Sequence, residues 1–133
     1  MLPPTILNKP SDSQLIPIKN KKITQAILSA LADQEMRAIM DSSIFRAKSF
    51  NEIVKETGIP HSTAFRKLKA MLNDGIMIVE KIEFTADGKK YSLFRSSLRS
   101  INVKYEMGEV LIEADENVSA MAKVAERFFS FDA

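Results

Sequence analysis

Apolar residues recur every three or four positions through the first half of the chain, which predicts a series of short helices. A first helix is predicted from about Lys21, because positions 23, 26, 27, 30 and 31 are all apolar. Asp33 is the expected N-cap of a second helix, whose inner face carries Met36, Ile39 and Met40. We therefore expect two consecutive helices, each with one apolar face.

A third and a fourth helix are predicted next, joined by a short turn. Ser49 and Glu52 form a capping box at the start of the third helix, and Gly58 is placed to end it with a positive φ. The fourth helix is predicted over about residues 63–73, capped by Ser62 or by the threonine that follows it. Two helices joined in this way are typical of a helix-turn-helix. The apolar stripe of the fourth helix consists of Ala64, Leu68, Met71 and Leu72.

After Gly75 the apolar period changes to two, which predicts β-strands. A first hairpin is expected from about Ile76 to Arg95, with its turn at Asp87-Gly88. A second hairpin with strict alternation follows, and its turn is expected at Met107-Gly108. Residues 117–130 return to helical spacing and predict a last helix, whose apolar face includes Val118, Met121, Ala122, Ala125, Phe128 and Phe129.

This order of elements predicts the fold class α+β and a chain in three parts. Residues 1–19 are rich in proline and are expected to form a flexible N-terminal arm, held partly by the apolar residues at 15, 16 and 18. Residues 20–98 are expected to form the helix-turn-helix with its hairpin. Residues 99–133, the second hairpin and the last helix, are expected to form an extension.

The composition narrows the function classes. The chain has 133 residues, of which 45% are hydrophobic and 27% charged, as in an ordinary soluble domain. It has no cysteine, which excludes disulfides, thiolate metal sites and cysteine nucleophiles. Its single histidine, His61, argues against an all-nitrogen zinc site and against a His-centred catalytic triad. No bilayer span and no secretory signal are visible. We expect a cytoplasmic domain that binds no metal or cofactor and is not an enzyme.

The net charge of +2 conceals an uneven distribution. Basic residues dominate residues 1–30, 61–73 and 86–99, whereas acidic residues dominate from Glu106 to the end. Such asymmetry bears on partners rather than on the fold, and it favours a polyanion on one side of the molecule.

The outward side of the fourth predicted helix carries the candidate chemistry. Arginine can pair with guanine and asparagine with adenine, while lysine and serine can bind phosphate oxygens. Lys89 and Lys90, at the tip of the first hairpin, could reach flanking DNA, and Arg95 is a weaker candidate. Each of these residues also has an ordinary structural explanation. The arginine and lysines can form a solvated basic face, Ser62 and Thr63 can cap the helix, and Phe65 can be a hydrophobic flank. The outward row consists of Ser62, Arg66, Lys69 and Asn73, flanked by Thr63, Phe65 and Ala70.

Three linked segments carry a resemblance to a known family. They are ALADQEMRAIM, SFNEIVKETGIPHSTAFRKLKAMLNDGIM and ADGKKYSLF, and they lie within about Thr24 to Ser96. Together they resemble the winged helix-turn-helix transcription regulators of the ArsR type, particularly the archaeal ones. The resemblance implies a recognition helix at 61–73, a wing at about 76–95 and a homodimer whose recognition helices lie about one DNA turn apart. The DNA-reading residues that it implies are Ser62, Thr63, Phe65, Arg66 and Lys69.

The chain departs from this family at two places. Metal-sensing members carry cysteines on the helix before the turn, where this chain has Ser49-Phe50-Asn51-Glu52-Ile53-Val54, so metal sensing by that route is excluded. Asp33-Gln34-Glu35-Met36 also replaces the more usual Asp-Pro-Thr-Arg.

The last quarter of the chain suggests how copies associate. An apolar helix face either folds back on its own domain or forms a dimer seam. Glu113, Asp115 and Glu116 are expected at the N-terminus of the last helix, where carboxylates are favourable. The candidate dimerisation residues are Val118, Met121, Ala125, Phe128 and Phe129.

These observations predict a homodimeric regulator that binds double-stranded DNA sequence-specifically and blocks or recruits the transcription machinery. The alternative is a winged-helix protein-interaction module within a transcription complex. An enzyme is not expected, because the sequence has no glycine-rich phosphate loop, nucleophile elbow or metal-ligand cluster.

Overall fold

The computed structural model describes residues 15–117, which form four α-helices and two three-stranded antiparallel sheets. The prediction of an α+β chain is confirmed. The predicted last helix, with all five candidate dimerisation residues, lies outside the described residues. The helices are α1 (Lys21–Ala32), α2 (Gln34–Ser42), α3 (Phe50–Thr57) and α4 (His61–Asn73). The strands are β1 (Leu15–Ile18), β2 (Lys48–Ser49), β3 (Met77–Phe84), β4 (Lys90–Ser96), β5 (Leu98–Glu106) and β6 (Glu109–Glu116).

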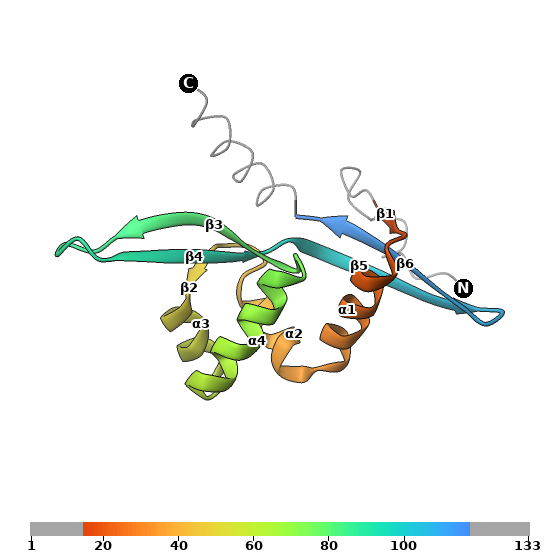
Figure 1. Ribbon diagram of the computed structural model, residues 1–133, viewed down its shortest axis with the longest axis horizontal. Helices are drawn as coiled ribbons and strands as arrows, with labels where there is room; N and C mark the ends of the chain where they lie inside the picture. Colours follow the sequence, from red (N-terminus) through yellow and green to blue (C-terminus); the bar gives the residue numbers. More distant parts are fainter. Residues whose placement is uncertain (1–14, 118–133) are drawn as a thin grey trace, which may run out of the picture.

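The two sheets are built on the two predicted hairpins. One sheet has the strand order β2-β4-β3 and the other β1-β6-β5. The hairpins extend in opposite directions from the middle of the molecule, and the helices lie below them in Figure 1. Ile18 pairs with Ile112 and Leu15 with Asp115, so the end of the predicted N-terminal arm is the edge strand of the second sheet.

A single apolar cluster joins the helices to both sheets. Ile27 of α1, Ile39 of α2 and Ile53 of α3 are almost fully buried in it, together with Met77 of β3. Ile112 of β6 belongs to the same cluster. In the described part of the chain, the second hairpin therefore shares its core with the helices and is not a separate appendage.

Most predicted helix ends agree with the structure. The Asp33 carboxylate accepts hydrogen bonds from the backbone N–H groups of Glu35 and Met36 at 2.9 and 3.0 Å. Ser49 and Glu52 form the expected capping box, and Gly58 ends α3 in the left-handed conformation at φ 72°. These motifs were predictable because each depends on residues a few positions apart.

The predicted cap of α4 is wrong. The helix begins at His61, with Pro60 in the cap position, and neither Ser62 nor Thr63 makes a capping hydrogen bond. Pro60 has φ −55°, which suits entry into a helix, and its carbonyl accepts a hydrogen bond from the Ala64 N–H at 2.9 Å. Both hydroxyl residues are therefore already inside the first turn.

Glu113, Asp115 and Glu116 lie in a strand, and the helix that they were expected to cap falls outside the described residues. All three belong to β6, which continues through Glu116 because it pairs with β5 on one side and β1 on the other. Asp115 is buried, and its carboxylate pairs with the Arg99 guanidinium at 3.1 Å. These carboxylates are accordingly sheet residues.

Candidate nucleic-acid interface

The outward side of α4 is open to solvent, because its inward side supplies the core. Ala64, Leu68 and Met71 are 0, 3 and 1% exposed, so they orient the helix. Thr63 is half-buried at the flank. The predicted row on the opposite side is exposed along its whole length, and it consists of Ser62, Arg66, Lys69 and Asn73.

Phe65 has one side in solvent and one side against α3. The residue is 57% exposed, and its ring meets the ring of Phe50 edge-on, with the ring centroids 5.9 Å apart. Phe50 also meets His61 edge-on at 4.7 Å. The three rings hold the N-terminal half of α4 against the start of α3, which is the hydrophobic-flank role that the sequence left open for Phe65.

Lys67 is the one cation of α4 that points inward. Its Nζ lies 2.6 Å from the Asp33 carboxylate and 2.8 Å from that of Glu35, both at the start of α2. The hydrogen bond from Lys67 lowers the pKa of Asp33, and the hydrogen bond to Asp33 raises the pKa of Lys67. Lys67 therefore fastens α4 to α2, while Arg66 and Lys69 pair with no carboxylate of the described residues.

The N-terminus of α4 differs from those of the other described helices. Side chains of Asn20, Asp33 and Ser49 cap α1, α2 and α3, whereas α4 has no side-chain cap. Its first turn also carries no acidic residue. The backbone N–H groups of the first turn and the positive end of the helix dipole are therefore left to face solvent or an anion.

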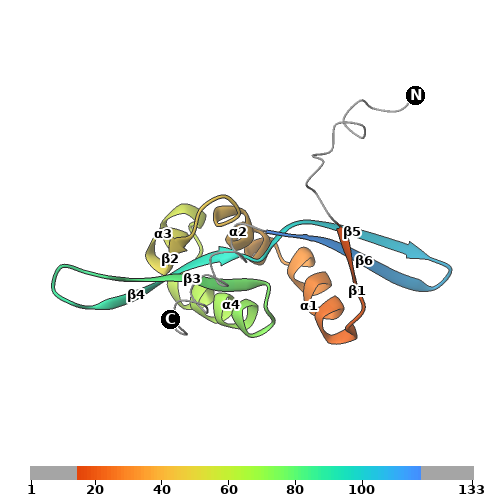
Figure 2. The same ribbon diagram turned by 90° about the horizontal axis from the view of Figure 1, so that it is seen from above.

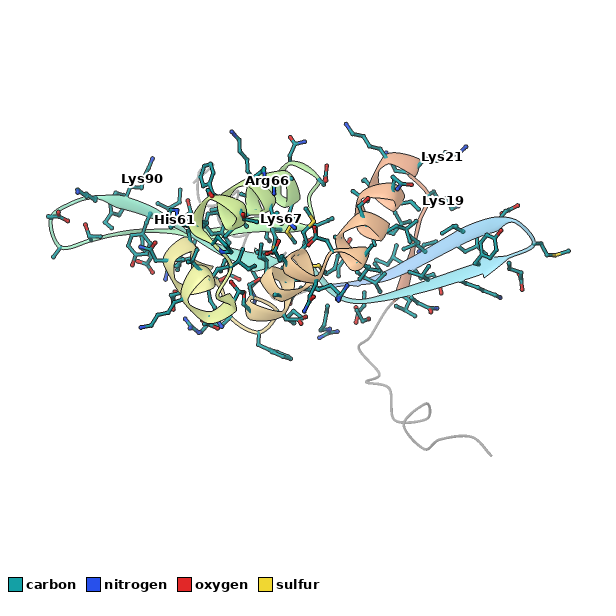
Figure 3. The ribbon with its side chains drawn as sticks, turned by 90° about the horizontal axis from the view of Figure 1, so that it is seen from below. Lys19, Lys21, His61, Arg66, Lys67 and Lys90 are labelled. Carbon is teal, nitrogen blue, oxygen red and sulfur yellow. The ribbon has the colours of Figure 1, made fainter. Side chains whose placement is uncertain are left out.

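The β3–β4 hairpin places two further lysines in solvent. Its turn is closed by a hydrogen bond from the Thr85 N–H to the Lys89 carbonyl at 2.8 Å and by Gly88 at φ 88°. Lys89 and Lys90 are both exposed, and neither forms an ion pair within residues 15–117. Figure 3 shows Lys90 on the same edge of the molecule as Arg66.

Arg95, the weaker sequence candidate, is not available to a ligand. Its Nε donates to the Ile44 carbonyl at 3.1 Å, one terminal nitrogen donates to the Phe45 carbonyl at 3.0 Å, and the other pairs with Glu80 at 2.9 Å. The Arg95 and Glu80 side chains are 12 and 10% exposed. Arg95 therefore joins the hairpin to the loop after α2.

Two open grooves lie beside α4 and the β3–β4 hairpin. One runs along α4 between Phe65 and Asn73. The other separates the start of α3 from the hairpin, and it is lined by Ser49 to Glu52 on one side and by Thr85 and Lys89 to Phe94 on the other. Asn51 and Ser92 line the second groove and were missed from the sequence, because only the packing of the hairpin over α3 brings them together.

Residues 15–117 contain no cluster of acidic and histidine side chains arranged to hold a metal ion. In the same part of the chain, no helix has the length and apolarity that crossing a bilayer requires. Comparison with protein-family models, with curated proteins and with solved structures found no match to this chain.

Proposed function

We propose that this protein is a transcription regulator that binds double-stranded DNA through a winged helix-turn-helix. In this proposal α3 and α4 are the helix pair, α4 is the recognition helix and the β3–β4 hairpin is the wing. The observation that carries the proposal is that the basic side chains of α4 differ in whether a described carboxylate pairs with them. Arg66 and Lys69 are exposed and unpaired by described residues, whereas Lys67 is held by Asp33 and Glu35.

The exposed row of α4 has the chemistry that a major groove accepts. Arg66 can donate two hydrogen bonds to the edge of a guanine, and Asn73 can pair with an adenine. Lys69 and Ser62 suit phosphate oxygens, which position the helix without reading sequence. The uncapped N-terminus of α4 supports the same proposal, because its free N–H groups favour a phosphate.

The wing supplies a second contact in this proposal. Lys89 and Lys90 lie at the far end of a hairpin that extends beyond the helices. From there they can bind phosphates or the minor groove next to the segment that α4 occupies. Two copies on a pseudo-palindromic operator are the expected arrangement, and sedimentation of the free protein and of its DNA complex tests the homodimer.

The salt dependence of duplex affinity tests the proposal. A protein that makes about four to eight phosphate contacts shows a steep decrease of log affinity with log salt, with a slope of about −4 to −7. Binding should also be stronger for duplexes selected from the native genome than for random duplexes of equal length. A flat slope together with equal, weak binding of both duplexes would reject the proposal.

A protein-interaction module is the second candidate function, and one observation favours it. The outer half of the β5–β6 hairpin exposes apolar side chains, among them Tyr105 at 74% and Met107 at 96%. Exposed apolar clusters are typical of protein-binding surfaces. The flat salt slope described above would favour this function over DNA binding.

A further inference from the structure

A second group of lysines lies outside the recognition helix and the wing. Lys19 precedes α1, and Lys21 and Lys22 are its first two residues. All three are exposed, and none forms an ion pair with a described residue. By contrast, ion pairs occupy several other cations of the described chain, which are Arg46, Lys48, Lys67, Lys81, Arg95, Arg99 and Lys104.

The position of these lysines is unfavourable for the helix that carries them. The N-terminus of a helix bears partial positive charge, so acidic residues stabilise the first turn and basic residues oppose it. The first turns of α2 and α3 contain Glu35 and Glu52. The first turn of α1 contains no acid and begins with two lysines, and Asn20 alone caps its N–H groups. Local stability therefore does not explain Lys21 and Lys22.

The start of α1, where these lysines lie, is on the same side of the molecule as the candidate interface. Viewed from above, α1 and α4 lie along one side, and α2 and α3 lie along the other (Figure 2). Figure 3 shows Lys90, Arg66 and Lys21 along the same edge, with Lys19 next to Lys21. The sequence of α1, KKITQAILSALA, adds no carboxylate to this edge. The edge therefore carries positive charge from three separate elements, and no carboxylate within residues 15–117 pairs with it.

We propose that Lys19, Lys21 and Lys22 bind the sugar-phosphate backbone of the same DNA duplex, on the side of α4 away from the wing. This inference rests on the proposed function and extends its contact surface. Lysine ammonium groups on flexible, exposed stems suit phosphates as point charges. The contacts are accordingly independent of base sequence and contribute equally to cognate and random DNA.

The test compares two charge-matched double variants. Lys21→Gln/Lys22→Gln removes two lysines from the proposed surface, and Lys55→Gln/Lys104→Gln removes two exposed lysines from α3 and β5. The probe is a random-sequence duplex, with affinity measured over a series of salt concentrations. The first variant should bind about tenfold more weakly, with a log–log slope shallower by about two, and the control should stay within about twofold of the unchanged protein.

A single variant separates the loss of a DNA contact from any effect on the stability of α1. Lys19 lies before the helix, so Lys19→Gln leaves every residue of α1 unchanged. It should weaken binding of the random duplex about threefold and make the slope shallower by about one. Thermal unfolding of Lys19→Gln and of Lys21→Gln/Lys22→Gln should match or exceed that of the unchanged protein, because neither variant loses an ion pair with a described residue.

Failure of this inference differs from failure of the proposed function. If the unchanged protein binds duplex DNA and Arg66→Ala weakens that binding, while Lys21→Gln/Lys22→Gln and Lys19→Gln both behave like the control, the inference is overturned and the proposed function remains. If the unchanged protein shows no salt-dependent binding of any duplex, the proposed function fails and the inference fails with it.

Discussion

The two sides of the helical layer use charge differently. On the side of α2 and α3, carboxylates sit where they stabilise the fold: Asp33 and Glu52 accept backbone hydrogen bonds at helix starts, and the Ser49 N–H lowers the pKa of Glu52. On the side of α1 and α4, neither first turn contains an acid, and exposed cations remain unpaired by described residues. Carboxylates thus stabilise the helix starts on one side, whereas the helix starts on the other side carry no acidic side chain and remain favourable for a polyanion.

The largest expected effect concerns Arg95, which binds two carbonyls of the loop after α2. Arg95→Ala should lower the free energy of unfolding by about 3 kcal/mol, because Glu80 and two loop carbonyls lose a buried partner. Chemical denaturation measures the loss. Arg46→Ala is the control, since its pair with Glu52 is exposed and should contribute less than about 1 kcal/mol. Equal losses in the two variants would contradict the structural role of Arg95.

Arg66→Ala is the matching change on the side of α1 and α4. It should leave unfolding almost unchanged and weaken binding of a cognate duplex by about 1–3 kcal/mol, with reduced discrimination at one base pair. Titration of cognate and random duplexes measures both quantities. An equal loss on the two duplexes would make Arg66 a phosphate contact rather than a base contact.

Asp33 should make stability depend on acid pH. Its folded pKa lies below the ordinary value of 3.8, so its ionised form stabilises the fold above that value, and this contribution is lost as the pH falls through the lowered pKa. Asp33→Asn keeps a capping side chain but removes the charge, and should flatten this part of the profile. Asp33→Ala also removes the cap and should cost about 1 kcal/mol at neutral pH. An unchanged acid profile in Asp33→Asn would contradict the assignment.

The smallest expected effect reverses the charge at the start of α1. Lys21→Glu/Lys22→Glu should raise the free energy of unfolding by about 0.5–1 kcal/mol, because acids favour a helix N-terminus. The same variant should bind duplex DNA more weakly than Lys21→Gln/Lys22→Gln. Thermal unfolding and duplex titration measure the two effects. A loss of stability would show that these lysines serve the fold and would remove the contrast between the two sides.

The local sequence determined the helices, the turns and the direction of the α4 side chains. Apolar spacing and caps such as Ser49 with Glu52 act over a few residues, so they can be recognised without knowledge of the rest of the chain. For the same reason the exposed row of Ser62, Arg66, Lys69 and Asn73 follows from the buried stripe opposite. The start of α4 was the local exception, because Pro60 begins the helix before the residues that were expected to cap it.

Only the tertiary structure decided which basic side chains the described carboxylates pair with, and on which side of the molecule the others lie. Lys67 and Arg95 have the same charge as Arg66, but Asp33 and Glu80, distant in sequence, hold them. The pairing of β1 with β6 and the position of α1 and α4 along one side of the molecule (Figure 2) likewise depend on contacts between elements far apart in the chain. A sequence specifies the charge of each side chain locally, whereas its partners are determined by packing between residues far apart along the chain.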